Sequence, residues 1–202
     1  MTVSTYDSGN GSGDAQRVNQ HTDLELMIAV QQGEVGKMGV LFERHHARIY
    51  NFCHRMTGSQ AASEDLVQEA FMRALKYRQT FRGDAEFLPW LYRLARNVCN
   101  DYFQKSQRFP VTAEDLPEEA SSDPSALEAA QQREQVCLLR QALLRLPVER
   151  REVLILSRFE FRNYEEIAQL LGCSVGAVKV RVHRAMNQLR ETYREMLKEN
   201  ES

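Results

Sequence analysis

Apolar residues recur every three or four positions along most of this chain, and no segment alternates apolar and polar residues over any length. This spacing is typical of amphipathic helices. It predicts helices over residues 23–32, 37–57, 63–77, 90–105, 126–144 and 147–159. The pattern therefore predicts an all-α protein.

A further helix, a tight turn and a last helix are predicted over residues 164–184. Asn163 and Glu166 have the spacing of a capping box at the start of the first of these helices. Gly172 is suited to end that helix in a left-handed conformation, and Ser174 is suited to cap the next one. The segment therefore predicts a helix-turn-helix.

The last helix has an apolar side and a basic side. Val178 and Val182 recur at helical spacing and should pack inward. Lys179, Val180, His183 and Arg184 lie on another face. Between positions 175 and 190 there are four Lys or Arg residues and no Asp or Glu. A basic, acid-free second helix is the element that a helix-turn-helix protein places in a major groove, although similar helix pairs also occur in other all-α proteins.

Charge is distributed unevenly, although the net charge is only −2. Residues 71–108 include eight basic and three acidic side chains, whereas residues 112–134 include seven acidic and one basic. Pro117 and Pro124 lie in the acidic stretch and Pro110 lies just before it, which indicates a flexible linker. Any affinity for nucleic acid must therefore come from local basic patches.

The cysteines give no indication of a metal site. Cys53, Cys99, Cys137 and Cys173 are scattered, which is typical of small apolar residues in a reducing compartment. The histidines near Cys53 fit no zinc-ligand spacing. No metal, cofactor or catalytic group is predicted, since no nucleophile–base pair or phosphate loop is present.

The chain contains no apolar run long enough to span a membrane. Residues 1–20 are polar and rich in Gly and Ser, unlike a signal peptide, and are predicted to form a disordered tail. These features predict a cytoplasmic protein.

A stripe of polar residues is predicted on the helix over residues 63–77, with Ser63 as its cap and Glu64 near its positive end. Asp65, Gln68, Glu69 and Met72 share one face at spacings of three, four and seven. The stripe is interpreted either as a solvated face or as a surface for a protein partner.

Aromatic and basic residues alternate from Phe81 through the loop predicted over residues 82–89 and into the helix that follows it. The aromatic residues are Phe81, Phe87, Trp90 and Tyr92, and the basic residues are Arg82, Arg93 and Arg96. Such a combination is typical of a groove for unstacked single-stranded bases. From their spacing alone, Phe87 and Trp90 are predicted to be core residues rather than DNA contacts, because large aromatic side chains are usually buried.

The order of these motifs resembles that of bacterial RNA polymerase sigma factors. The matching segments are D-L-V-Q-E-A-F, F-R-G-D-A-E-F-L-P-W-L-Y-R-L-A-R-N, a Pro-containing acidic linker, L-P-V-E-R-R-E-V-L, and Y-E-E-I-A-Q-L-L-G-C-S-V-G-A-V-K-V-R-V-H-R-A. Together they extend over nearly the whole chain in a fixed order, which is far more specific than a single helix-turn-helix. The two-domain form resembles the extracytoplasmic-function (ECF) group.

The resemblance implies two helical domains joined by a flexible acidic linker. The expected division is a tail over residues 1–21, sigma region 2 over 22–108, the linker over 109–133, and the region 4 helix-turn-helix over 134–198. The implied function is to bind core RNA polymerase, recognise the −10 and −35 promoter elements and promote DNA melting.

The resemblance also implies roles for individual residues. Asp65, Gln68, Glu69 and Met72 match the helix that docks on the β′ coiled coil of the polymerase. Residues that match the −10 region are Arg82, Gly83, Asp84, Phe87, Trp90, Arg93 and Asn97. Residues that match the −35 reader are Lys179, Val180, His183 and Arg184. Implied partners are the β′ and β subunits, promoter DNA and an anti-sigma factor.

The sequence departs from the family pattern at a few positions. Val180 stands where many relatives carry a small hydroxyl residue, and His183 replaces a longer aromatic or aliphatic one. A valine can contact a thymine methyl group but cannot donate a hydrogen bond. The family pattern therefore does not predict which DNA sequence this helix would recognise at −35. The alternatives are a stand-alone helix-turn-helix regulator and a helical adaptor protein.

Overall fold

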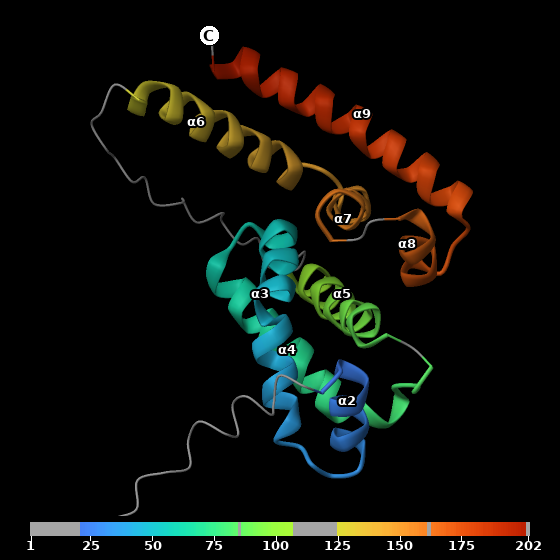
Figure 1. Cartoon of the computed structure of the whole chain (residues 1–202). Helices are drawn as coiled ribbons and strands as arrows, with labels where there is room; N and C mark the ends of the chain where they lie inside the picture. Colours follow the sequence, from blue (N-terminus) through green and yellow to red (C-terminus); the bar gives the residue numbers. More distant parts are fainter. Residues whose placement is uncertain (1–20, 85, 107–124, 161–162, 201–202) are drawn as a thin grey trace, which may run out of the picture.

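The computed structural model describes residues 21–84, 86–106, 125–160 and 163–200 (Figure 1). Its elements in chain order are α2 (Asp23–Gln31), α3 (Lys37–Thr57), α4 (Gln60–Lys76), η1 (Arg78–Thr80), α5 (Phe87–Ser106), α6 (Ser125–Leu144), α7 (Val148–Ile155), η2 (Leu156–Glu160), α8 (Tyr164–Leu171) and α9 (Val175–Asn200). No strand occurs among these described residues, which confirms the predicted all-α class.

Helices α2 to α5 form an N-terminal bundle. In it α3 packs against α4 and α2, and α4 packs against α5. Its core is made of fully buried apolar side chains such as Ile49, Phe52, Met56 and Leu91. The apolar face that sequence periodicity predicted for α3 is thus the face that fills the bundle.

The turn between α3 and α4 differs from the prediction. Gly58 ends α3 with a φ of 73°, and the hydroxyl of Ser59 caps α4 by accepting from the Ala62 N–H. Ser63, the predicted cap, is instead buried one turn inside the helix, where its hydroxyl donates to the Ser59 carbonyl. The Ser63 assignment was wrong because a second serine precedes it directly after the glycine.

Helix α5 begins at Phe87, three residues before the predicted start. Pro89 therefore lies in the first helical turn, where the backbone N–H groups have no partner within the helix, so the N–H that proline lacks is not needed. The predicted loop of residues 82–89 is shortened accordingly.

Helices α6 to α9 form a C-terminal domain in which the long helices α6 and α9 lie side by side (Figure 1). Of the predicted linker over 109–133, residues 109–124 lie outside the described residues. Residues 125–133 belong to α6, so the helix takes part of the range assigned to the linker. The predicted tail over residues 1–20 also lies outside the described part of the chain.

The helix-turn-helix forms as predicted over α8 and α9. Asn163 caps α8 by accepting from the Glu166 N–H at 2.8 Å, although the reciprocal half of a capping box is not formed. Gly172 ends α8 with a φ of 63°, and the Ser174 hydroxyl accepts from the Ala177 N–H at 3.2 Å.

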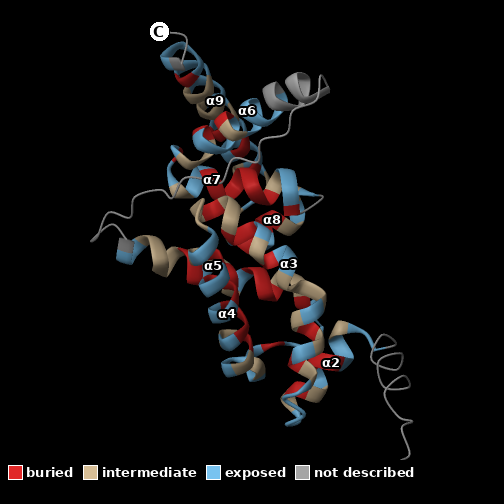
Figure 2. Cartoon of the chain, turned by 90° about the vertical axis from the view of Figure 1, so that its left-hand side faces the viewer, coloured by how far each residue is buried: buried red, intermediate tan, exposed pale blue. Residues whose placement is uncertain are grey.

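The two domains pack directly against each other. Helix α7 contacts α3, and α8 contacts α5. Their buried side chains form one continuous hydrophobic cluster that includes Tyr92 and Cys99 of the bundle and Ile155 and Leu156 of the C-terminal domain. In Figure 2 the buried positions continue from α3 and α5 into α7 and α8. The linker therefore joins domains that are already in contact.

Arg151 of α7 fixes this arrangement through hydrogen bonds to carbonyl groups. Its guanidinium donates to the Leu143, Leu144 and Leu146 carbonyls at the end of α6, and across the domain boundary to the Met56 carbonyl. Burial lowers the pKa of Arg151 to about 10, so the group remains charged at neutral pH. Each of these bonds has a charged donor and is stronger than a neutral one.

Two carboxylates of the C-terminal domain lie in the same interface. Glu160 accepts from the Tyr92 hydroxyl and from Arg55 at 3.0 Å, and its side chain is only 3% exposed. Glu152 accepts from Arg96 at 2.6 Å. Buried carboxylates require such partners, because an unpaired buried charge is costly.

Glu160 lies at the end of a π-helical turn, η2, that follows α7 directly. Such turns are rare and are often found at functional sites. Here the adjacent Phe159 ring lies 4.4 Å from the Arg55 guanidinium carbon. The turn therefore presents a ring and a carboxylate to the same arginine of the bundle.

We expect Arg151→Ala to lower the free energy of unfolding by about 3 kcal/mol or more, because several buried carbonyls lose a charged donor. Urea denaturation followed by circular dichroism measures this change. Arg150→Ala, at an exposed neighbouring position, is the control and should change stability little. A loss below about 1 kcal/mol for Arg151→Ala would contradict the role assigned to this side chain.

Candidate functional site

The basic face of α9 is exposed to solvent. Lys179, His183 and Arg184 are all exposed, and Val180 is 49% exposed, whereas Val178 and Val182 are buried beneath them. Within the part of the chain that the structure describes, neither Lys179 nor Arg184 takes part in an ion pair. Their charges are therefore available to an external anion.

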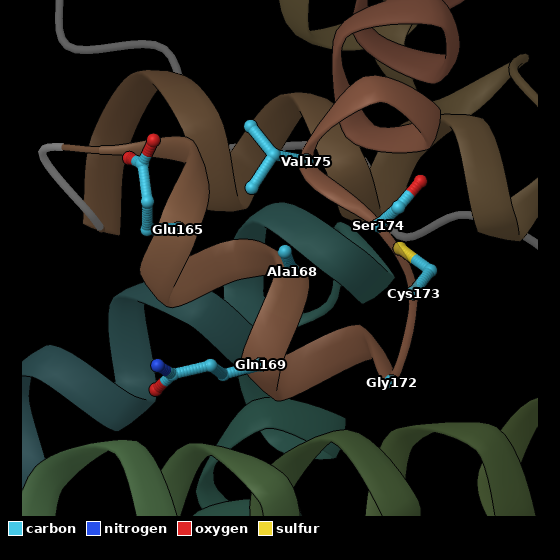
Figure 3. Close-up of a pocket in the computed structure, with 7 residues that line it drawn as sticks. All are labelled: Glu165, Ala168, Gln169, Gly172, Cys173, Ser174 and Val175. Carbon is cyan, nitrogen blue, oxygen red and sulfur yellow. The ribbon is translucent and has the colours of Figure 1, made fainter.

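The turn before α9 encloses a shallow hollow (Figure 3). It is lined by Glu165, Ala168, Gln169, Gly172, Cys173, Ser174 and Val175. Cys173 and Ser174 lie on the turn itself, and the Glu165 carboxylate lies across the hollow from both in Figure 3. The hollow thus offers shape but no group arrangement for nucleophilic chemistry.

The polar stripe predicted on α4 is present on the surface. Asp65, Gln68 and Glu69 are exposed, and Met72 is 63% exposed. Glu69 accepts from Arg73 at 2.7 Å, and this hydrogen bond raises the pKa of Arg73. An exposed thioether beside carboxylates and an amide is a feature of adaptable protein-binding surfaces.

The short loop before α5 is held by a side-chain amide from α2. Gln31 donates to the Arg78 carbonyl at 2.8 Å and to the Phe81 carbonyl at 2.9 Å, using both N–H groups of its amide. Arg82, Gly83 and Asp84 follow immediately and are exposed. A fixed anchor thus leads into an exposed polar loop.

Phe87 and Trp90 lie in the core, not on the surface. Phe87 is 3% exposed and Trp90 is 9% exposed, and both rings pack against Phe81 at centroid distances of 6.2 and 5.4 Å. The resemblance assigns both to DNA contact, whereas their size and spacing favour the core, and the structure agrees with the core. In this state the rings support the loop from beneath, because a bundle of this size buries its largest aromatic side chains.

The remaining residues of α5 point in two directions. Arg93 and Asn97 are exposed and lie one helical turn apart. Tyr92 and Arg96, which the sequence grouped with them, face the C-terminal domain instead, where they bind Glu160 and Glu152. Burial, with the neighbouring carboxylate, raises the pKa of Tyr92, so its hydroxyl stays a hydrogen-bond donor.

No group of three or more His, Cys, Asp or Glu side chains that could hold a metal ion occurs among the described residues. Cys53 and Cys99 lie 3.8 Å apart between their sulfur atoms, and both are buried. The neighbouring Cys53 thiol, together with burial, raises the pKa of Cys99. None of the described helices is both long and apolar enough to cross a membrane.

Sequence reasoning did not find the residues that join the domains. Glu160 lies more than one hundred positions from both Arg48 and Arg55, and each of the three looks like an ordinary charge on a helix face. The sequence around Gln31 likewise does not indicate that its side chain holds the loop before α5. No local pattern could have found these contacts, since they depend on the approach of distant helices.

Comparison with known proteins agrees with the geometry. Residues 41–109 match the family model for sigma-70 region 2, and residues 138–189 match the model for sigma-70 region 4. The first match includes the α4 stripe and the loop before α5, and the second includes the exposed face of α9. The chain belongs to the sigma-70 family of RNA polymerase sigma factors.

Whole-chain relatives place it in the ECF group of that family. The RNA polymerase sigma-H factor of Pseudomonas aeruginosa is 31% identical over 90% of this chain and 99% of its own. The ECF RNA polymerase sigma-E factor of Escherichia coli K12 is 34% identical over 82% of this chain and 91% of its own. The resemblance inferred from the motifs is thereby confirmed.

A solved structure of a sigma factor also matches most of the chain. CnrH in complex with the cytosolic domain of CnrY superposes with a TM-score of 0.61 and 25% identity, over 89% of this chain and 99% of that one. Like its relatives, this chain is a sigma factor that serves transcription initiation, and none of these matches indicates an enzyme family. The alternatives of a stand-alone regulator and a helical adaptor are not supported.

Proposed function

We propose that this sigma factor docks on core polymerase through α4 and reads promoter DNA with two separate surfaces. The observation that carries the proposal is that exposed and buried side chains alternate along each of three helices. On α4, on α5 and on α9, polar residues matching family contact positions are exposed while their apolar neighbours fill the core. The three surfaces are therefore free to bind without unfolding either domain.

The core-polymerase surface is the α4 stripe of Asp65, Gln68, Glu69 and Met72. Its carboxylates suit a basic partner helix, and Met72 supplies an exposed apolar contact at its end. The proposed partner is the coiled coil of the β′ subunit, with the C-terminal domain contacting β. The protein would act in the cytoplasm, where that polymerase is found.

The −10 surface consists of the loop that begins with Arg82, Gly83 and Asp84, together with Arg93 and Asn97 of α5. Exposed amide and guanidinium groups can bind the edge and the phosphate of an extruded base. Phe87 and Trp90 act from beneath by fixing the loop, as their burial requires. Gln31 holds the loop's other end.

The −35 surface is the exposed face of α9 with Lys179, Val180, His183 and Arg184. Arg184 and Lys179 can bind guanine edges or phosphates, and Val180 can contact a thymine methyl group. The helix-turn-helix caps fix the angle at which α9 leaves the turn, so the face is presented as a rigid unit.

Melting follows from contacts that form only with the open strand. Binding at −35 positions the factor on duplex DNA, and the −10 surface then stabilises an unpaired base. No bond is made or broken by this chain. We also propose control by an anti-sigma protein, since the solved relative CnrH is bound to the cytosolic domain of another protein.

The overall test is reconstitution of transcription. The protein is mixed with core RNA polymerase and a library of promoter DNA, and specific run-off transcripts are sequenced. We expect transcripts that depend on the added protein and share upstream elements. Absence of such transcripts with active core enzyme would refute the proposal.

Asp65→Lys combined with Glu69→Lys should weaken binding to core polymerase by about tenfold or more, because reversed charges meet a basic partner. Surface plasmon resonance with immobilised core enzyme measures the affinity. Glu34→Lys combined with Glu43→Lys changes the charge equally at exposed positions away from α4 and serves as the control. Equal affinities for the two double variants would show that α4 is not the docking helix.

Lys179→Ala and Arg184→Ala should each weaken binding to −35 duplex DNA, by about 1–3 kcal/mol where the side chain reads a base. A base-reading residue also changes preference at one base pair, whereas a phosphate contact reduces the salt dependence. Competition binding against a randomised duplex pool measures both properties. Arg190→Ala, farther along the same exposed helix, should change sequence preference little, and wild-type behaviour of both test variants would exclude α9 as the reader.

Asn97→Ala should spare binding to core polymerase and −35 DNA but reduce open complexes on duplex promoter by about tenfold, a loss of roughly 1.4 kcal/mol. Permanganate footprinting of thymines near the start site measures melting. A template with a pre-melted bubble should rescue the variant, since the unpairing cost is already met. Gln104→Ala, exposed at the far end of α5, is the control, and normal melting by Asn97→Ala would remove this residue from base capture.

A further inference from the structure

Arginines of the N-terminal bundle gather on the face that meets the C-terminal domain. Arg48 donates to the Glu160 carbonyl at 3.0 Å, and Arg55 lies 3.0 Å from the Glu160 carboxylate. Arg96 on α5 lies 2.6 Å from the Glu152 carboxylate. We name Arg48, Arg55 and Arg96 the arginine face.

The present partners of the arginine face are Glu152 and Glu160 of the same chain, mainly through their carboxylates. Both carboxylates are nearly inaccessible, with exposures of 3% for Glu160 and 7% for Glu152, while the Arg48 side chain is 50% exposed. Guanidinium groups bind carboxylate and phosphate with the same fork of donors. The arginine face is therefore built for an anion, and a phosphate group can replace a carboxylate there.

The arginine face adjoins the proposed −10 surface. Arg96 directly precedes Asn97 on α5 and lies one turn from Arg93. Arg93 and Asn97 are exposed, whereas Arg96 faces the C-terminal domain, where it binds Glu152. A DNA strand held at Asn97 would thus pass within reach of Arg96 once the C-terminal domain has moved.

The packed arrangement cannot serve both promoter elements at once. Helix α5 contacts α8, and α8 contacts α9, so the helices that carry the two DNA surfaces are separated by about two interhelical distances of roughly 8–10 Å. Elements about 25 base pairs apart lie roughly 85 Å apart along B-form DNA at 3.4 Å per base pair. The domains must therefore separate on a promoter.

We infer that the arginine face is a phosphate-binding site for promoter DNA, which Glu152 and Glu160 occupy while the two domains are packed together. Separation removes the carboxylates and frees the guanidinium groups in the same step. The inference rests on the proposed function for the identity of the anion. It adds a DNA contact of the bundle that is masked in the packed state.

The free-energy cost of burying the carboxylates of Glu152 and Glu160 favours their replacement by DNA phosphates. Burial raises the pKa of Glu152 despite its hydrogen bond to Arg96. The carboxylate is thus poorly solvated in the packed state and regains water when the domains separate. The arginines lose nothing in the exchange when phosphates take the place of the carboxylates.

The test uses the full chain without polymerase. Glu152→Gln combined with Glu160→Gln should increase the radius of gyration in small-angle X-ray scattering. It should also tighten binding to a fluorescent duplex with a single-stranded −10 extension by about tenfold at low salt, with a salt dependence steeper by roughly 0.7–0.9 per added phosphate contact. Glu149→Gln combined with Glu191→Gln removes the same charge at exposed positions of α7 and α9 and is the control.

A second variant assigns the gain to the arginine face. The substitutions Arg48→Gln, Arg55→Gln and Arg96→Gln are added to the Glu152→Gln/Glu160→Gln variant. The DNA affinity and its salt dependence should then return to the wild-type values, while the radius of gyration stays increased. Tyr92→Phe, which removes one donor to Glu160, provides a milder opening should the double variant lose helicity in circular dichroism.

Three results would overturn the inference. The first is that the Glu152→Gln/Glu160→Gln variant neither expands nor binds DNA more tightly. The second is that it expands but binds DNA no more tightly than the control variant. The third is that it still binds DNA more tightly after Arg48, Arg55 and Arg96 have been replaced. Because no polymerase is present, the outcome is separate from that of run-off transcription. A chain that passes this test but yields no transcripts would refute the proposed function alone.

Discussion

The buried carboxylate of Glu160 lies where the two domains of this sigma factor meet. It is held by the Tyr92 hydroxyl and by Arg55, and Arg48 binds the carbonyl of the same residue. A carboxylate that is 3% exposed is stable only with such partners, so Glu160 can stay buried only while the N-terminal bundle supplies them. The π-helical turn at η2 is what delivers Glu160 to that position.

The same physics distinguishes this interface from an ordinary core. Around Glu160 the buried cluster is apolar, and apolar contact alone specifies neither register nor partner. The ionic contacts and the Arg151 hydrogen bonds to carbonyls add direction. They also make the interface reversible, because every charged group in it can be satisfied by water or by another ion after separation. Stability and release therefore depend on the same side chains.

Both DNA surfaces are presented by helices whose opposite sides are buried. On α9 the valines at 178 and 182 fix the helix while Lys179 and Arg184 stay exposed, and on α5 Leu91 is buried while Arg93 stays exposed. Recognition by rigid helices requires this division, since a reading side chain must be positioned before it meets its base. The loop at Arg82 is the exception, and it is held at one end by Gln31 and from beneath by Phe87.

The sequence by itself determined the fold class, the helix-turn-helix and the exposed stripes, because each depends on spacing within one helix. The end of α8 at Gly172 and the polar face of α4 followed from local chemistry, and so did the family. The sequence misplaced the cap of α4 and left Phe87 and Trp90 between surface and core. Only the tertiary structure decided that Tyr92 and Arg96 face Glu160 and Glu152 while the two domains are packed together. The physical reason is that their partners are 68 and 56 positions away, so their fate depends on how helices from two domains approach each other, which no local pattern encodes.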